Sequence, residues 1–175
     1  NVIPGVDSTE EVHGFRLGKF EIKLGSTTDL SNDVPLFRLS DIMMIKAECL
    51  LRTSKANDAA TIVSMVRNRS FVTNASKATV TGAQLQAGSS YDYGRRDYKV
   101  TTHEGGADVQ YGRFLDELGW EFNQEPHRRQ DMIRFGIFTK KSWLSHAPNG
   151  DYRKLMPIPA DVLSTNPKLK QNPGY

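Results

Sequence analysis

Acidic side chains recur at a regular interval within residues 115–136, LDELGWEFNQEPHRRQDMIRFG. Glu117, Glu121 and Glu125 are four residues apart, so in a helix they would share one face. Two carboxyl groups held near each other can cleave a glycosidic bond, provided that one of them stays protonated. The spacing therefore raises one catalytic hypothesis, that of a glycoside hydrolase.

The same stretch also contains the cations that would neutralise these acids. Like charges at this interval repel each other, so a helix that keeps three of them needs basic partners. Guanidinium groups close to a carboxylate lower its pKa and keep it ionised, which is unsuitable for a general acid. We therefore predict a structural ion-pair network instead of a catalytic site. Its expected members are Glu117, Glu121, Glu125, Arg128, Asp131, Arg134 and, from an earlier helix, Arg67.

Metal binding and other catalytic chemistry receive little support from the sequence. Only His127 and Asp131 have the i,i+4 spacing of two metal ligands on one helix face, and Arg128 and Arg134 compete for the carboxylate. The chain has neither a glycine loop of the phosphate-binding type nor a Gly-x-Ser-x-Gly elbow. We expect no metal, no cofactor and no enzymatic activity.

Two helices separated by a break must position these side chains. Pro126 cannot continue a helix, but it suits the first turn of a new one. The helix before it presents Leu115, Leu118 and Phe122 as an apolar stripe. A second helix is expected over residues 127–134. The chain is therefore expected to turn a corner at Pro126.

A helical hairpin is expected earlier in the chain, at about residues 40–52 and 58–69. The first helix has two apolar faces, one with Leu39, Met43, Ala47, Leu50 and Leu51, the other with Ile42, Ile45 and Cys49. A helix that is apolar on two sides needs neighbours on two sides. The hairpin resembles a tetratricopeptide unit, which buries its faces by stacking. Cys49 is the single cysteine, which excludes an internal disulfide, and it is expected to be buried as a small apolar group.

Aromatic and charged side chains mix in the long loop at residues 78–110. Sugars offer C–H groups for stacking and hydroxyl groups for hydrogen bonding, and long polar loops are often functional. The candidate ligand contacts are Tyr91, Tyr93, Tyr98, Arg95 and, beyond the loop, Trp143. Alternatively, the tyrosines pin the loop to the helices, or the loop contacts a partner protein. Trp120 is expected to pack between helices, and Trp143 to be exposed.

The two ends of the chain are expected to be extended. Phe20, Ile22 and Leu24 alternate with charged residues, which suits a short strand or an extended loop. The tail at residues 155–175 contains four prolines, each of which biases its predecessor to extended geometry. We expect this tail to wrap over the helices, with a short turn near residues 160–163.

Composition indicates a globular chain without an obvious nucleic-acid partner. The 175 residues are 38% hydrophobic and 25% charged, which fits one domain with one core. The net charge of +3 is small, and the basic residues alternate with acids instead of forming a patch. No apolar run is long enough to cross a membrane.

Four segments in order resemble the SusD/RagB family. Residues 34–52 match its Arg-x-x-Asp and Ala-Glu helix through Arg38, Asp41, Ala47 and Glu48. Residues 66–69, Val-Arg-Asn-Arg, match the end of the following helix. Residues 121–136 resemble the family's Glu-Phe-x-x-Glu and Asp-Leu-x-Arg-Trp-Gly signature, with Pro126 where glycine is usual and Arg129 where an aromatic residue is usual. The tail at residues 155–175 resembles the C-terminal signature.

The resemblance implies a mainly α fold of tetratricopeptide-like helical hairpins, with long loops and an extended Pro-rich C-terminal tail. It implies a non-catalytic lipoprotein, exposed at the surface of the outer membrane, that captures an oligosaccharide or other nutrient and passes it to a SusC-like TonB-dependent transporter. Residues 1–175 would then be the C-terminal domain of a longer chain, with the signal peptide and lipidated cysteine upstream. The matching motifs are scaffold positions, so no ligand-binding residue transfers. A free-standing tetratricopeptide-like scaffold for protein partners is the alternative.

Overall fold

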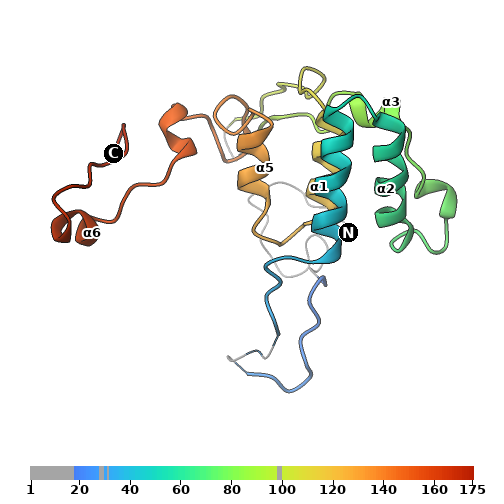
Figure 1. Ribbon diagram of the computed structural model, residues 1–175, viewed down its shortest axis with the longest axis horizontal. Helices are drawn as coiled ribbons and strands as arrows, with labels where there is room; N and C mark the ends of the chain where they lie inside the picture. The colour runs from blue at the N-terminus through green and yellow to red at the C-terminus, as the bar shows by residue number, and fades with distance from the viewer. Residues whose placement is uncertain (1–17, 28–29, 31, 98–99) are drawn as a thin grey trace.

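The computed structural model describes residues 18–27, 30, 32–97 and 100–175, and these residues are mainly helical (Figure 1). This confirms the predicted fold class, while the finer tetratricopeptide-like likeness stays a prediction. In chain order the elements are α1 (Leu39–Arg52), α2 (Ala56–Asn68), η1 (Ala75–Lys77), α3 (Gly82–Gln86), β1 (Gly94–Arg95), α4 (Gly112–Glu121), α5 (Arg128–Arg134), β2 (Trp143–Leu144), η2 (Asp151–Lys154) and α6 (Ala160–Thr165).

Helices α1 and α2 form the predicted hairpin, lying side by side in Figure 1. A short turn joins them, and Ser54 in that turn takes a left-handed backbone conformation, which lets the chain reverse. The facing surfaces bury Met44 and Ala47 of α1 and Ala59 and Val63 of α2. Small side chains at the contact let the two helices approach closely.

Helix α4 completes the core and ends earlier than predicted. Its stripe of Leu115 and Leu118 is buried, as is Phe122 directly after the helix. The helix stops at Glu121, so Glu125 lies in the following turn and does not share a helical face with the other acids. The reason is local: Gln124 takes a left-handed conformation just before the proline. Helix α5 then restarts within one residue of the predicted position.

Only one apolar face of α1 is covered. Met44, Ala47 and Leu51 are buried, whereas Ile42, Ile45 and Leu39 are exposed, although the sequence places Leu39 on the same apolar face as Ala47 and Leu51. Cys49 is also exposed, which corrects the expectation that it is buried. The physical reason is that α2 packs against the opposite side of α1, so the thiol falls on the uncovered face.

The described residues of the loop at 78–110 contact the helices and include short regular elements. It contains α3, and β1 pairs in parallel with β2, with Gly94 opposite Trp143. The buried carboxylate of Asp116 on α4 accepts hydrogen bonds from the Ser89 hydroxyl at 2.5 Å and the Ser90 backbone N–H at 2.7 Å. Buried polar groups need such partners, so Asp116 anchors the loop to the core.

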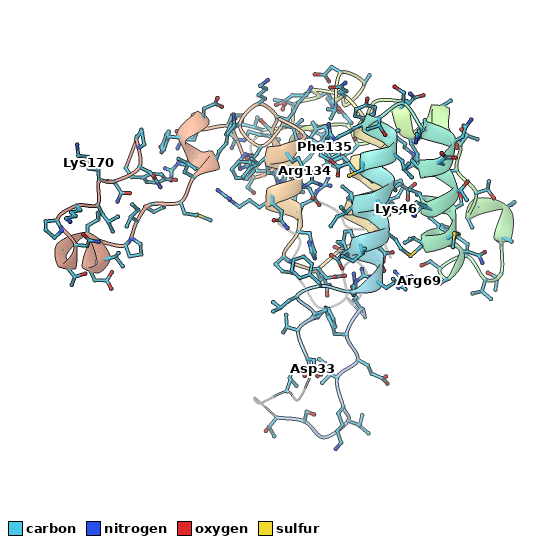
Figure 2. The ribbon with its side chains drawn as sticks, viewed as in Figure 1. Asp33, Lys46, Arg69, Arg134, Phe135 and Lys170 are labelled. Carbon is cyan, nitrogen blue, oxygen red and sulfur yellow. The ribbon has the colours of Figure 1, made fainter. Side chains whose placement is uncertain are left out.

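Both described ends project from the helical body (Figure 1). Residues 18–37 include no strand within the described part, so the extended-loop alternative holds there. The tail forms α6 near the predicted turn, but it points away from the helices, which corrects the expectation that it wraps over them. Its contacts are partly internal, since Gln171 pairs with both backbone polar groups of Ile158. Figure 2 shows Asp33 and Lys170 on these two projections.

None of the helices in the described ranges is both long enough and apolar enough to span a bilayer.

Gly112 allows α4 to start directly against the loop that precedes it. A Cβ at this position would lie 2.1 Å from the backbone nitrogen of Ser89, which cannot move aside easily. We expect Gly112→Ala to lower the free energy of unfolding by about 1–3 kcal/mol, the usual cost of overpacking. Urea denaturation measures this loss. Gly119→Ala in the same helix is the matched control, because its Cβ would meet only the flexible end of Arg128 at 2.9 Å. Equal losses for the two variants would contradict the argument.

Candidate functional site

Arg38 is the centre of a charged cluster that joins α1 to the turn after α4. Its guanidinium donates to both carboxylate oxygens of Glu125, at 3.0 and 2.8 Å, and to Glu121 Oε1 at 2.5 Å. Lys19 also contacts the Glu125 carboxylate. A planar guanidinium matches a carboxylate through two parallel hydrogen bonds, which is the strongest geometry for such a pair.

The contacts with Arg38 and Lys19 keep the Glu125 carboxyl group ionised. Its side chain is only 1% exposed, and burial alone would raise its pKa. Hydrogen bonds from Arg38 and Lys19 outweigh burial and lower the pKa of Glu125 to about 2. The same contacts raise the pKa of Arg38. A carboxyl group held in this state cannot serve as a general acid near neutral pH.

Glu117 belongs to a second ion-pair group, on the buried side of α4. Arg67 Nη1 lies 2.8 Å from each of its two carboxylate oxygens, and Arg113 lies 2.7 Å from one of them. Arg67 also donates to the backbone carbonyls of Lys77 and Ala78. The acid therefore ties α4 to the end of α2 and to the loop that follows it.

A third ion-pair group joins α5 to α1. Arg134 donates to Glu48 at 3.0 and 2.8 Å and to Asp131 at 2.8 Å. Burial acts to raise the pKa of Glu48, but hydrogen bonds from Arg134 and Arg52 lower it overall. Burial raises the pKa of Asp131, and Arg134 offsets this only in part. The Arg134 guanidinium is therefore shared between the carboxylates of Glu48 and Asp131.

The structure places Glu117, Glu121, Glu125, Asp131, Arg134 and Arg67 in ion pairs, and the expected contact of Asp131 with Arg134 is present. Arg128 donates to the backbone carbonyl of Leu115 at 2.8 Å, where an acid was expected. Arg38, Glu48 and Lys19 were missed as members of the cluster, and Arg38 is 87 residues from Glu125 in sequence. The family motif in residues 34–52 contains Arg38 and Glu48, and it was the one signal that could have pointed to them.

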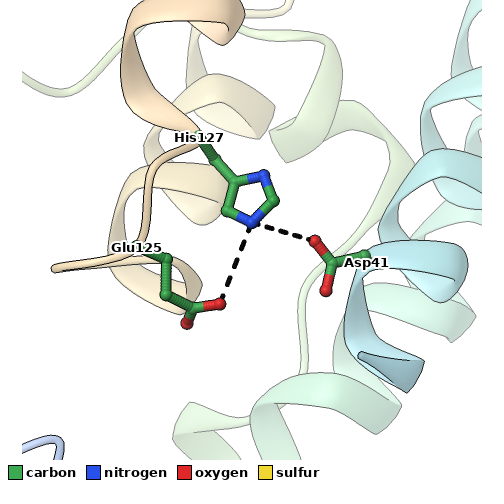
Figure 3. A group of neighbouring side chains, drawn as sticks. All are labelled: Asp41, Glu125 and His127. Atoms are coloured by element: carbon green, nitrogen blue, oxygen red, sulfur yellow. Dashed lines mark ion pairs between the residues drawn. The ribbon is translucent and has the colours of Figure 1, made fainter. Parts of the chain in front are cut away.

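One group in this cluster has the donor atoms of a cation site. His127 Nε2 lies 3.1 Å from Asp41 Oδ1 and 3.9 Å from Glu125 Oε2 (Figure 3). From sequence spacing alone, the candidate metal ligands are His127 and Asp131 instead. However, Arg38 already binds both oxygens of Glu125, and its backbone N–H donates to Asp41 at 2.8 Å. We therefore interpret Asp41, Glu125 and His127 as a structural contact, called the clasp below, that links α1 to the turn after α4.

A hollow of about 400 Å³ lies beside this clasp, between α1 and α5. Met44, Leu118 and Phe122 contribute its apolar lining, and His127 and Arg134 are among its polar residues. Every acid that borders it is close to a guanidinium or imidazole group, as Asp41, Glu48 and Asp131 show. The hollow thus opens onto the ion-pair network, not onto a free pair of carboxyl groups.

The described candidates for ligand contact lie near one another, because β1 with Arg95 pairs with β2 with Trp143, but they differ in exposure. Tyr91 is 42% exposed, whereas Tyr93 is 1% exposed and packs edge-on against it with ring centres 4.9 Å apart. Tyr98 lies outside the described residues. Arg95 forms an ion pair with Asp97. The alternative that a tyrosine pins the loop to the core therefore fits Tyr93.

Neither tryptophan has the environment expected for it. Trp143 is half-buried and stacks on His146, with ring centres 3.8 Å apart. Trp120 is 55% exposed instead of packing between helices. The reason is the end of α4, where Trp120 follows the buried Leu118 and the half-buried Gly119 and points away from the core. Sequence periodicity identifies the covered face of a helix only when its neighbours are known.

A comparison with protein families assigns the chain to a family. The chain belongs to the SusD family, whose model matches residues 4–175. This confirms the resemblance seen in the four sequence segments.

Two curated relatives are similar over most of the chain. The starch-binding protein SusD of Bacteroides thetaiotaomicron is 29% identical over 151 residues, which are 82% of this chain and 22% of the relative. The SusD-like protein P25 of Formosa agariphila is also 29% identical over 151 residues, 80% of this chain and 24% of the relative. The chain thus spans less than a quarter of the length of each.

Proposed function

We propose that this chain is the C-terminal domain of a non-catalytic glycan-binding lipoprotein at the surface of the outer membrane. The observation that carries the proposal is the family match over residues 4–175. The similarity to the starch-binding protein of Bacteroides thetaiotaomicron supports a glycan as the ligand. The bound oligosaccharide is then handed to a SusC-like TonB-dependent transporter, and the lipid anchor lies upstream of residue 1.

The charged cluster supports a structural role for the acids in this domain. Glycosidases need one carboxyl group that stays protonated and one that stays free. Glu121 and Glu125 both bind Arg38, and Glu117 binds Arg67. We infer that these side chains hold the helices in place and that the domain contributes architecture to ligand capture, not turnover.

Titration of the complete native polypeptide against a panel of oligosaccharides tests this function. We expect binding in the millimolar to micromolar range, roughly −4 to −8 kcal/mol. Isothermal titration calorimetry measures the affinity, and chromatography of the recovered sugars shows whether any bond was cleaved. We expect intact sugars. Saturable binding of a protein partner with no response to any glycan would support the tetratricopeptide-like scaffold instead, and released products would support a hydrolase.

A further inference from the structure

A second hollow, of about 470 Å³, lies where the end of α2 and the following loop meet α3 and α4. Trp120 and Phe71 both line it, and Arg38 and its partners do not. Trp120 is 55% exposed, so much of its indole surface is accessible. An exposed indole beside a hollow can stack on the apolar face of a small ligand while nearby polar groups orient it.

Two arginines that share one carboxylate hold the Trp120 and Phe71 rings in position. The Arg113 guanidinium carbon lies 4.4 Å from the centre of the Trp120 ring, and that of Arg67 lies 4.8 Å from the centre of the Phe71 ring. Both guanidinium groups bind the buried carboxylate of Glu117. Such cation–π and ion-pair contacts position the rings before a ligand arrives, which reduces the entropy lost on binding.

The charge of the hollow favours an anion. The ionisable side chains that line it are Arg67, Lys77 and Arg113, and no acid is among the described lining residues. Counting the Glu117 carboxylate behind them, three positive charges face one negative charge, so the net charge is +2. A positive hollow attracts and orients negatively charged groups. The Gln84 amide adds hydrogen-bonding capacity.

We propose that this hollow binds an acidic saccharide. A pyranose ring stacks on the face of Trp120 opposite the Arg113 guanidinium, and its carboxylate or sulfate group pairs with Lys77. The inference rests on the proposed glycan-binding function and narrows the ligand to an anionic class. It also gives residues 1–175 a direct contact with the ligand, in addition to their structural role.

Fluorine NMR of the complete native polypeptide, labelled with 5-fluorotryptophan, tests the contact directly. The Trp120 resonance is assigned by its loss in Trp120→Phe. We expect saturable shifts of this resonance on titration with hexagalacturonate or a sulfated carrageenan hexasaccharide, and no shift with neutral maltohexaose. The first two probes separate a carboxylate ligand from a sulfate ligand.

Two substitutions separate stacking from charge. Aromatic stacking is worth ~0.5–1.5 kcal/mol, so Trp120→Ala should weaken Kd for the acidic probe by about 2- to 10-fold. Lys77→Gln should weaken Kd several-fold and make it less sensitive to salt, because exposed charges are screened. Lys46→Gln on α1, outside the hollow, is the matched control and should leave Kd unchanged (Figure 2).

The outcomes distinguish this inference from the proposed function. A glycan that binds without shifting the Trp120 resonance, and with equal affinity to Trp120→Ala, overturns the inference and leaves the proposed function intact. Equal shifts with maltohexaose, together with an unchanged Kd in Lys77→Gln, overturn the acidic assignment. If no saccharide binds the folded polypeptide, both the proposed function and the inference fail.

Discussion

Replacing Arg38 with methionine is expected to lower the free energy of unfolding by up to about 3–5 kcal/mol, the cost of removing one partner of a buried ion pair, with Lys19 still in contact with Glu125. Arg38 donates to both oxygens of Glu125 and to the side chain and backbone carbonyl of Glu121. Methionine keeps most of the aliphatic stem but removes every donor. Urea denaturation at pH 7, followed by circular dichroism, measures the change.

Arg69→Met is the matched control for this substitution. Arg69 also pairs with Glu121, but its side chain is 57% exposed. An exposed ion pair contributes at most about 1 kcal/mol because water screens it. A loss for Arg69→Met as large as that for Arg38→Met would show that burial does not decide the contribution, contrary to the argument from Glu125.

Acid is expected to destabilise the protein through Glu125. The pKa of Glu125 is about 2 in the folded protein, and an unperturbed glutamate in the unfolded chain titrates near ~4.3. Because the unfolded chain takes up the proton first, the stabilisation is fully present above pH ~5 and is lost as the pH falls towards 2. This group alone should remove ~2–3 kcal/mol over that interval, allowing for solvent screening.

Glu125→Gln provides the comparison for the acid experiment. The amide keeps the shape of the side chain but cannot be protonated in this range, so the variant should be less stable at pH 7 and flatter between pH 5 and 2. Urea denaturation at a series of pH values measures both curves. Parallel curves for the variant and the native protein would assign the acid sensitivity to other carboxyl groups.

Local features of the fold could be predicted well from the sequence. The hairpin of α1 and α2 follows from apolar periodicity, and the corner after α4 follows from Pro126. Both depend on interactions between residues a few positions apart, which the sequence displays directly. The start of α5 was placed within one residue for the same reason.

Long-range pairing could not be predicted in the same way. Arg38 and Glu125 are 87 residues apart, and no periodic pattern connects them. The two-residue pairing of β1 with β2 is too short to produce an alternating pattern. Such contacts depend on how the helices pack, so residue types suggest an ion-pair network without specifying which charges meet.

The faces of helices were predicted only in part. The sequence shows that α1 has two apolar sides, but the structure is needed to show that the side with Ile42 and Cys49 is exposed. For the same reason, the exposure of Trp120 and the partial burial of Trp143 could not be predicted from the sequence. A side chain that is apolar by type can belong to a core or to a binding surface, and only its neighbours distinguish the two.

A double-mutant cycle between Arg38→Met and Glu125→Gln most directly tests the claim that these acids are architectural. The free energy of unfolding is measured for the native protein, both single variants and the double variant. We predict a coupling energy of at least ~2 kcal/mol, because residues in one buried network are strongly non-additive. Additivity within ~0.5 kcal/mol, the behaviour of independent sites, would show that the Arg38–Glu125 ion pair does not stabilise the fold. The catalytic hypothesis for Glu125 would then be open again.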